Sequence, residues 1–375
     1  MSVNNNKIEK LRVIISGGGT GGHIFPAIAI ANAIKQKAPE AEILFVGALG
    51  RIEMEKVPDA GYKIVGLPVA GFQRRLTFKN FSFFTKLFKS IKKAGEIIEQ
   101  FQPNFAVGVG GYASGPLLYK AGKKNIPYII QEQNSYAGVT NKLLAKKAKK
   151  ICVAYEGLEK FFQKEKIIIT GNPVRHNLLL PSVDKAEAYR FFGLQPTKKT
   201  VLIVGGSGGA RSINEAVIKN LEEIRNNKNI QFIFQTGKVY FPNVIKNIGE
   251  NIPENLKVAE FISKMEYAYQ IADLVVTRAG AGTISELCIM GKPAILVPSP
   301  NVAEDHQTKN AMALVKKNAA LLVSDFDAPD LLMKNTLNII NNDEQLNSLK
   351  TNILKLAIHN SAEKIADVIF NLRNV

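Results

Sequence analysis

A glycine-rich loop occurs twice in this chain of 375 residues, each time directly after a short apolar run typical of a strand. The first loop, residues 17–22, follows Arg12 to Ser16, and the second, residues 205–210, follows residues 201–204. A strand, a glycine turn and a helix in succession present backbone N–H groups at a helix N-terminus, where the helix dipole favours an anion. Two such units predict two nucleotide-type domains that face a shared cleft.

Short apolar runs alternate with amphipathic stretches along the whole chain, which predicts an α/β fold with two Rossmann-like domains on parallel sheets. We expect one domain over residues 1–172, a second over 173–360 with a hinge at 171–175, and a helix over 361–375 that packs back on the first. The expected strands are 12–16, 42–47, 62–67, 104–109, 127–131, 150–154, 167–170, 200–204, 230–235, 257–260, 273–277, 293–297 and 320–323.

The positive charge of the chain is concentrated in its first half. Residues 1–172 carry 26 lysines and arginines against 12 acidic residues, whereas residues 173–375 carry 23 against 20. This asymmetry predicts a partner surface rich in negative charge, either nucleic acid or anionic lipid. The two cysteines, Cys152 and Cys288, lie in apolar runs, so we expect free thiols and a cytoplasmic location.

Neither glycine loop fits the two commonest nucleotide-binding motifs. Residues 17–22 satisfy GxGxxG, but the second expected strand ends at Ala48 without the acidic residue that holds the ribose of a dinucleotide. Neither loop ends in the Gly-Lys-Ser/Thr of a P-loop ATPase. A dehydrogenase and a P-loop ATPase are therefore disfavoured.

His23 follows the first glycine loop, at the start of the next expected helix. Imidazole titrates near neutral pH, so His23 is a candidate general base, and the positive end of the helix favours its neutral form. The same position also suits a plain hydrogen bond to a phosphate or hydroxyl group. The residues alone leave both roles open.

Residues 277–286 form another glycine turn between a strand and a helix. Glu286 can accept hydrogen bonds from two adjacent ribose hydroxyls. The alternative is structural, because Thr283 and Glu286 have the spacing of a capping box. Both roles are compatible, since a cap does not use every lone pair of the carboxylate.

Other polar segments also follow expected strands. Residues 131–134 and 304–311 lie at the strand ends where open α/β sheets bind ligands. Asp325-Phe326-Asp327 matches the metal-binding DxD pattern of some sugar transferases, but its place ahead of a helix favours a turn and an N-cap. We therefore expect no essential protein-bound metal.

The stretch from Phe72 to Ile98 interleaves phenylalanines with lysines and arginines. On a helix, Phe81, Phe84, Leu87, Phe88 and Ile91 share one face, and an ordinary amphipathic helix packed on its domain explains that stripe. That explanation does not account for Phe72, Phe78 and Phe83, which lie outside the stripe. Together with the clustered basic residues, they suit a surface in contact with anionic lipid headgroups. We favour contact with a membrane.

Taken together, these segments resemble the MurG family of peptidoglycan N-acetylglucosaminyltransferases, which have the GT-B fold. The ordered set covers nearly the whole chain and is far more specific than any single motif. The matching segments are GGTGGHIFPA at 18–27, GVGGYASGP at 108–116, EQNSYAGVTNK at 132–142, GNPVR at 171–175, VGGSGGAR at 204–211, Phe261-Ile262, GAGTISE at 280–286 and DHQTKNA at 305–311.

The resemblance implies an inverting transfer of N-acetylglucosamine from UDP-N-acetylglucosamine to the muramoyl 4-hydroxyl of undecaprenyl-pyrophosphoryl-MurNAc-pentapeptide, which converts lipid I to lipid II. It implies a peripheral enzyme at the cytoplasmic face of the inner membrane. It also implies that the enzyme uses no cofactor and binds no nucleic acid, and that other cell-wall synthesis enzymes are further partners.

The resemblance also assigns roles to residues of this chain, with His23 as the leading candidate for the catalytic base. The residues placed around the donor sugar or pyrophosphate are Thr20, Gly21, Gly22, Asn134 and Gln307. Arg175 and Ser207 are placed near the phosphates, and the Ile262 backbone at uracil. Glu286 is placed on the ribose, within a loop that includes Ala281, Gly282, Thr283, Ile284 and Ser285.

Two rival functions remain compatible with parts of this pattern. A UDP-N-acetylglucosamine 2-epimerase shares the expected architecture, but it leaves the basic aromatic stretch unexplained. A non-enzymatic protein that binds nucleic acid explains the charge, but it leaves the glycine loops and Glu286 without a role. Steep salt dependence of DNA binding would favour the latter.

Overall fold

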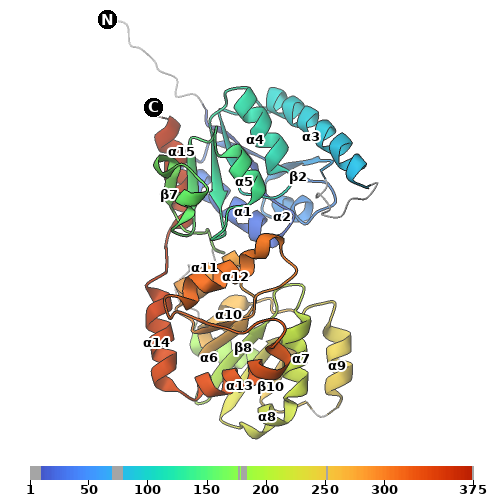
Figure 1. The fold of residues 1–375 in the computed structure, drawn as a ribbon, viewed down its shortest axis with the longest axis vertical. Helices are drawn as coiled ribbons and strands as arrows, with labels where there is room; N and C mark the ends of the chain where they lie inside the picture. Colours follow the sequence, from blue (N-terminus) through green and yellow to red (C-terminus); the bar gives the residue numbers. More distant parts are fainter. Residues whose placement is uncertain (1–9, 70–78, 176–177, 179–183, 251, 374–375) are drawn as a thin grey trace, which may run out of the picture. The chain divides into compact units, whose positions relative to one another are not determined.

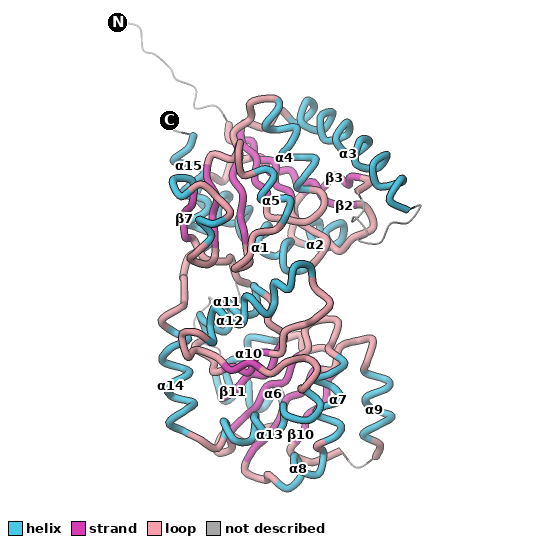
Figure 2. The backbone as a smooth tube through the Cα atoms, viewed as in Figure 1, coloured by secondary structure: helices cyan, strands magenta, loops and turns pink. Residues whose placement is uncertain are grey.

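The computed structural model describes residues 10–69, 79–175, 178, 184–250 and 252–373. Its chain divides into two compact units, one made of residues 1–175 and 360–375 and the other of residues 176–359. Both are α/β units with helices around a parallel sheet (Figures 1 and 2). Within the described ranges, no helix is both long enough and apolar enough to cross a bilayer.

The first unit is built on a seven-stranded parallel sheet with the order β3-β2-β1-β4-β5-β6-β7. This order places β1 and β4 side by side although β2 and β3 separate them in sequence, so the loops after β1 and β4 meet at the switch point of the sheet. The strands are β1 Arg12–Ser16, β2 Glu42–Ala48, β3 Lys63–Leu67, β4 Phe105–Gly108, β5 Tyr128–Glu132, β6 Lys150–Val153 and β7 Ile167–Ile169.

Helices cover both faces of this sheet, which explains why its inner strands are almost continuously apolar. Val13 and Ile15 of β1 pack with one set of helices, and the intervening Ile14 packs with the other set. The helices of this unit are α1 Gly21–Lys37, α2 Glu53–Asp59, α3 Lys79–Phe101, α4 Ser114–Lys123, α5 Val139–Leu144 and α15 Ser361–Arg373, with short 3-10 turns η1 Leu158–Lys160 and η2 Lys164–Lys166.

The last helix, α15, belongs to the core of the first unit. Its Ile365 and Ile369 are fully buried and pack in the same cluster as Ile30 and Ile34 of α1. Lys37 of α1 also pairs with Asp367 at 2.6 Å. Full burial of one isoleucine contributes about 1.5–3 kcal/mol, so apolar contacts carry most of this attachment.

The second unit repeats the arrangement with a six-stranded parallel sheet of order β10-β9-β8-β11-β12-β13. Here the switch point lies between β8 and β11, again beside a glycine loop. Its strands are β8 Lys199–Val204, β9 Ile230–Gln235, β10 Leu256–Ala259, β11 Leu274–Thr277, β12 Ala294–Leu296 and β13 Leu321–Leu322. Its helices are α6 Lys185–Phe192, α7 Arg211–Lys219, α8 Leu221–Asn226, α9 Phe241–Ile248, α10 Met265–Ile271, α11 Ala281–Met290, α12 His306–Val315, α13 Ala328–Ile340 and α14 Asp343–Leu354, with η4 Ala303–Asp305.

All thirteen expected strands are present within one or two residues of their predicted ends. The expected fold class of two Rossmann-like domains on parallel sheets is therefore confirmed. The boundary between the two compact units falls between Arg175 and His176, and the chain returns to the first unit at Asn360.

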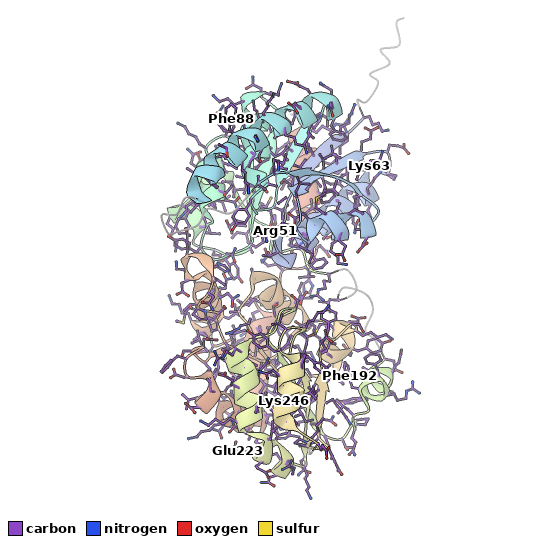
Figure 3. The ribbon with its side chains drawn as sticks, turned by 90° about the vertical axis from the view of Figure 1, so that its right-hand side faces the viewer. Arg51, Lys63, Phe88, Phe192, Glu223 and Lys246 are labelled. Atoms are coloured by element: carbon purple, nitrogen blue, oxygen red, sulfur yellow. The ribbon has the colours of Figure 1, made fainter. Side chains whose placement is uncertain are left out.

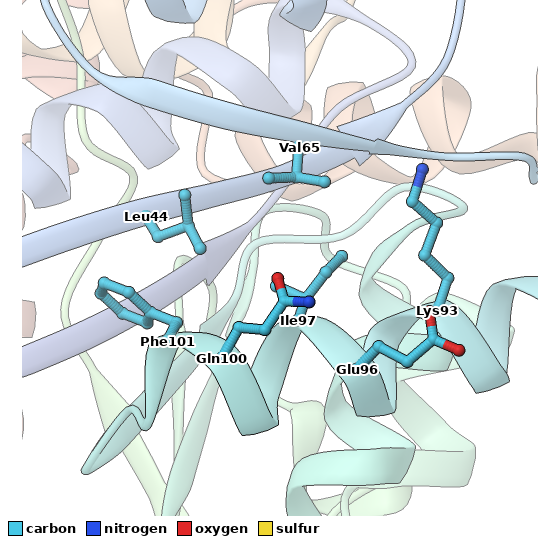
Figure 4. A pocket seen from close by; sticks show the side chains of 7 residues that line it. All are labelled: Leu44, Val65, Lys93, Glu96, Ile97, Gln100 and Phe101. Atoms are coloured by element: carbon cyan, nitrogen blue, oxygen red, sulfur yellow. The ribbon is translucent and has the colours of Figure 1, made fainter.

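A hollow of about 340 Å³ lies between α3 and strands β2 and β3, of which β3 is at the edge of the sheet (Figure 4). Its walls are mostly apolar, with three polar side chains from α3, and none of the predicted site residues lines it. The lining residues are Leu44, Val65, Lys93, Glu96, Ile97, Gln100 and Phe101.

Candidate functional site

The first glycine loop connects β1 to α1 at the switch point of its sheet. Thr20 occupies the N-cap of α1 in an extended conformation, without a side-chain cap, and its carbonyl accepts from the N–H of Ile24. Thr20 and Gly22 are exposed, and Gly21 is half-buried. The structure thus presents these residues at the positive end of a 17-residue helix, as an anion site requires.

His23 lies in the first turn of α1, with its ring folded back on the glycine loop. Its Nδ1 atom is 3.0 Å from the carbonyl oxygen of Gly18 and 3.3 Å from Oγ1 of Thr20. The ring also lies against Gly110, where a Cβ atom would be 2.7 Å from Cδ2. A side chain at position 110 would therefore displace the imidazole.

The loop after β4 packs directly on the first glycine loop. Gly111 has a φ of +87°, and a Cβ atom there would lie 2.3 Å from the Gly18 carbonyl oxygen, so only glycine fits. The hydroxyl of Ser114, at the start of α4, ties the two loops together, because it lies 2.9 Å from the Ser16 carbonyl and 2.8 Å from the Gly110 carbonyl and shares its single proton between them.

Asn134 is positioned by the buried carboxylate of Glu132 at the end of β5. Glu132 accepts from the N–H groups of Asn134 and Gly138 and from the side-chain amides of Asn134 and Asn141, at 2.8–3.3 Å. Burial raises the pKa of the Glu132 carboxyl, and these four donors oppose that rise by stabilising the ionised form. The carboxylate fixes the loop that carries Asn134, which is itself half-buried.

The amides beside Glu132 have a structural role, contrary to the expectation that the whole 131–134 segment faces a ligand. Gln131 and Gln133 are almost fully buried and hydrogen-bonded to each other. Gln131 also donates to Asn172 at 2.9 Å, and Asn172 donates to the carbonyl of Gln133 at 3.0 Å. Buried amides of this kind satisfy one another, and here they hold residue 172 against the end of β5.

Arg175, the last residue of the first unit's long segment, is exposed. Its guanidinium lies 5.7 Å from the ring centroid of Phe25, two residues after His23 on α1. The structure therefore places a cation next to the helix that begins at the first glycine loop.

The second glycine loop leads from β8 into α7, and Ser207 lies exposed within it. Gln235 at the end of β9 fixes this loop, because its side-chain amide donates to the Gly206 carbonyl at 3.0 Å. The same side chain accepts from the N–H of Ile262 at 2.8 Å. The N–H of Ile262 is therefore already engaged within the second unit.

Glu286 lies in the middle of α11, close behind the loop at 277–280. Its side chain is largely buried, and Oε2 accepts from the hydroxyl of Tyr269 on α10 at 3.1 Å. The alternative capping box is wrong, because α11 begins at Ala281 after an N-cap at Gly280, so Thr283 is already inside the helix. The N-terminal end of the helix is half-buried at Ala281, Gly282, Thr283 and Ser285. Ile284 is buried.

Gln307, in the first turn of α12, fixes the loop after β12. Its Oε1 accepts from the N–H of Ser299 at 2.9 Å. In this contact the side-chain oxygen of Gln307 is the acceptor, so its NH2 group is the part of the amide that can donate.

Asp325 and Asp327 do not act together. Asp325 pairs with Arg278 at 2.5 Å and accepts from Ser212 at 2.5 Å, which joins the ends of β11 and β13 to the start of α7. Asp327 is at the N-cap of α13, but its carboxylate accepts from Ser324 and not from a helix N–H, so the turn is present and the expected side-chain cap is not. Among the described residues, no three His, Cys, Asp or Glu side chains cluster as a metal site would require.

Neither cysteine is a candidate nucleophile. Cys152 and Cys288 are free and buried, and burial raises the pKa of each thiol to about 12. A thiol with so high a pKa carries almost no thiolate near neutral pH.

The outer side of α3 is cationic with an exposed aromatic ring. Phe88 is 73% exposed, contrary to its expected place in the packed stripe (Figure 3), whereas Ala94, Ile97 and Ile98 form the buried face. Lys86, Lys89 and Lys92 are exposed along the same helix. Phe72 and Phe78 lie outside the described residues, and nothing is described of the side chains of Phe81 and Phe84.

Sequence reasoning missed Tyr269, Gln235 and Gly110. Each acts through a contact between segments far apart in the chain, namely with Glu286, with Gly206 and Ile262, and with His23. Only the end of a strand marks Gln235 as a candidate. Gly110 lies in the segment GVGGYASGP at 108–116, to which no role was assigned residue by residue, and no local pattern marks Tyr269.

Two family models match the chain. The glycosyltransferase family 28 N-terminal domain matches residues 13–153, and the glycosyltransferase family 28 C-terminal domain matches residues 200–369. The first match includes strands β1 to β6 but not β7, and the second includes strands β8 to β13 and most of α15.

Curated relatives match over almost their full length. The UDP-N-acetylglucosamine--N-acetylmuramyl-(pentapeptide) pyrophosphoryl-undecaprenol N-acetylglucosamine transferase of Bacteroides fragilis is 59% identical, with 99% of each chain covered. The protein of the same name from Phocaeicola vulgatus is 60% identical, with 97% of each chain covered.

Solved structures show the same fold. MurG from Acinetobacter baumannii has a TM-score of 0.76 at 27% identity, with 96% of this chain and 99% of that chain covered. A UDP-GlcNAc 2-epimerase from Neisseria meningitidis has a TM-score of 0.68 at 15% identity, with 96% and 100% covered, a likeness of fold alone. With both domain models matched and identities near 60% to full-length relatives, this chain belongs to glycosyltransferase family 28 and, within it, to the MurG family of N-acetylglucosaminyltransferases.

Proposed function

We propose that this protein transfers N-acetylglucosamine from UDP-N-acetylglucosamine to the 4-hydroxyl of the muramoyl sugar in an undecaprenyl-pyrophosphoryl-MurNAc-pentapeptide, with inversion at the anomeric carbon. The observation that carries this proposal is the 59% identity, over 99% of both chains, to a curated transferase with this donor and acceptor in its name. The 2-epimerases share only the fold.

The second unit is proposed to hold the nucleotide. Glu286 would accept from the two ribose hydroxyls, the Ile262 carbonyl from the uracil N–H, and the loop around Ser207 would donate to the phosphates. Gln307 would donate to the sugar. The supporting geometry is that Glu286 and Ile262 are each fixed by a neighbouring side chain, so little freedom is lost on binding.

The first unit is proposed to supply the chemistry at the acceptor. His23 would take the proton of the muramoyl 4-hydroxyl as its oxygen attacks the anomeric carbon, while the bond from that carbon to the diphosphate oxygen breaks and its electron pair leaves with UDP. Thr20, Gly21, Gly22 and Asn134 would contact the donor sugar or its pyrophosphate. A base positioned in this way contributes about 10²–10⁴-fold to the rate.

The departing diphosphate needs positive charge or N–H donors as its own charge develops. Helix N-terminal N–H groups are fixed before the reaction and therefore stabilise that charge without reorganisation. Arg175, exposed beside Phe25, would add a cation to them. These groups fit a reaction without an essential protein-bound metal.

The acceptor carries a polyprenyl chain, so we also propose that the protein works as a peripheral enzyme on the cytoplasmic face of the inner membrane. The exposed Phe88 and the lysines of α3 support a contact with anionic headgroups. Each basic residue near such a surface contributes about 1 kcal/mol. Other cell-wall synthesis enzymes remain proposed partners.

The test is transfer of radiolabelled sugar from UDP-N-acetylglucosamine to a lipid I analogue by wild type, His23→Ala and Glu286→Ala. We expect His23→Ala to lower kcat about 10²-fold or more with little change in the donor KM. We expect Glu286→Ala to raise the donor KM about 10–100-fold, because hydrogen bonds to a charged group are worth about 1.5–3 kcal/mol.

Two exposed residues provide matched controls, His359→Ala and Glu254→Ala, which should transfer sugar at the wild-type rate. Wild-type protein without transferase activity toward the lipid I analogue would overturn the proposed function. Full activity of both site variants would leave the function standing and show that the assigned roles are wrong.

A further inference from the structure

Glu53 has a fully buried carboxylate that the proposed reaction does not use. It is the first residue of α2, and it is 0% exposed. Among the residues that the structure describes, no lysine, arginine or histidine nitrogen lies within 4.0 Å of it. Burial of a carboxylate lowers the stability of the fold by several kcal/mol unless hydrogen bonds satisfy it. The hydrogen-bond partners of Glu53 therefore indicate its role.

Both oxygens of Glu53 accept from backbone N–H groups at the ends of adjacent strands. Oε2 accepts from Gly19 in the first glycine loop at 2.8 Å, and Oε1 accepts from Ala48 at the end of β2 at 2.9 Å. Two glycines make room for the side chain, because a Cβ at Gly18 would lie 2.2 Å from Oε1 and one at Gly47 would lie 2.6 Å from Cγ.

The peptide that Glu53 holds is also the peptide that holds His23. The N–H of Gly19 donates to Glu53, and the carbonyl of the same peptide unit, that of Gly18, lies 3.0 Å from Nδ1 of His23. A carbonyl oxygen can only accept, so Nδ1 carries the proton in this contact, and in the neutral ring Nε2 then carries the lone pair. A hydrogen bond from the N–H of a peptide to an anion polarises its carbonyl and strengthens the bond that the carbonyl accepts.

We propose that Glu53 is a positioning residue for His23 and acts through the Gly18–Gly19 peptide. The carboxylate fixes this peptide, and the peptide fixes the Nδ1-protonated tautomer and the ring orientation, so that Nε2 is the atom that receives the proton of the acceptor hydroxyl. The arrangement is a carboxylate–histidine pair with one peptide group between the partners, and carboxylates set the tautomer of functional histidines in the same way. This inference rests on the proposed role of His23.

The first test measures the tautomer directly. In wild-type protein labelled with ¹⁵N-histidine, long-range ¹H–¹⁵N correlation spectra report which ring nitrogen carries the proton, and the spectrum of His23→Gln assigns the signal among the four histidines. We expect His23 to be protonated at Nδ1 near neutral pH. Protonation at Nε2 in the wild type would overturn the proposal, whether or not any Glu53 variant folds.

The second test is Glu53→Gln, which keeps the shape of the side chain but can accept only one of the two N–H groups. We expect kcat for sugar transfer to fall about 10–100-fold, the donor KM to stay within about twofold, and the Nδ1 tautomer to lose its dominance. The matched control is Glu55→Gln on the same helix, whose side chain is 71% exposed and pairs with Lys56. Glu55→Gln should leave kcat, the donor KM and the tautomer of His23 unchanged.

The outcomes separate this proposal from the proposed function. If Glu53→Gln keeps the wild-type kcat and tautomer while His23→Ala loses activity, the role of Glu53 is wrong and that of His23 stands. If His23→Ala keeps full activity, the role of His23 fails, and with it the inference for Glu53. A Glu53→Gln variant that raises the donor KM as strongly as it lowers kcat would show a purely structural role.

Discussion

At the scale of residues, buried polar groups hold the side chains that are proposed to bind ligands in each unit. Tyr269 donates to Glu286, Glu132 holds the loop of Asn134, and Gln235 spans the second glycine loop and Ile262. Each supporting group is itself buried. Because buried polar groups are costly when unpaired, these contacts make one conformation of the site much more stable than its alternatives.

Removal of the Tyr269 hydroxyl tests this arrangement on the nucleotide side. Tyr269→Phe removes the hydroxyl that donates to Oε2 of Glu286, so the carboxylate is held less firmly before the nucleotide binds. We expect a rise of about tenfold or more in the donor KM, or in the Kd for UDP measured by calorimetry, because a hydrogen bond to a charged group is worth about 1.5–3 kcal/mol. We expect kcat to change little.

Tyr267→Phe is the control, because it lies on the same helix and its hydroxyl donates to Glu187 at 2.5 Å. UDP affinity should be unchanged in this variant. Equal UDP affinity in Tyr269→Phe and wild type would show that Tyr269 does not orient Glu286.

At the scale of elements, α3 has a buried face and an exposed face. Its inner face buries Ala94, Ile97 and Ile98 in the core of the first unit, while Phe88 is mostly exposed among lysines. The exposed Phe88 beside the lysines is the observation behind the proposed contact with a lipid surface.

We expect Phe88→Ser to lower the binding of the protein to vesicles of phosphatidylglycerol and phosphatidylethanolamine several-fold, measured by co-sedimentation. Reducing the anionic lipid to zero should weaken wild-type binding as well, because the lysines then lose their partners. The control is Phe326→Ser, at a phenylalanine that is 91% exposed in the second unit between two aspartates. If both variants bind anionic vesicles as tightly as the wild type, α3 is not the membrane contact.

At the scale of the whole molecule, two Rossmann-like units predict separate responses to ligands. If the second unit holds the nucleotide, UDP alone should protect its amides first. We expect hydrogen exchange to slow in residues 205–210 and 280–286 on addition of UDP, and the melting temperature to rise, since 100-fold excess over Kd contributes about 2.7 kcal/mol.

Glu286→Ala is the matched variant for this experiment, and at the same UDP concentration it should show much weaker protection and a smaller shift of the melting temperature. UDP protection confined to the first unit would contradict the assignment of the nucleotide to the second.

The sequence by itself determined the fold class, all thirteen strands and the family, because alternating apolar and amphipathic runs, glycine turns and ordered motifs are local properties of the chain. It also located His23 at the start of α1 and Glu286 behind a glycine turn. It misjudged the 131–134 segment and the Thr283 cap, since burial and the first residue of a helix depend on what packs around them.

Only the tertiary structure decided which polar groups act together. Glu53 lies 34 positions from Gly19 along the chain, and Tyr269 lies 17 positions from Glu286, yet each pair is joined by a hydrogen bond. Strand order brings these segments together at the carboxyl edge of each sheet. A pattern within one segment carries no information about that order, because hydrogen bonds between side chains and distant backbone groups form only when the sheet is assembled.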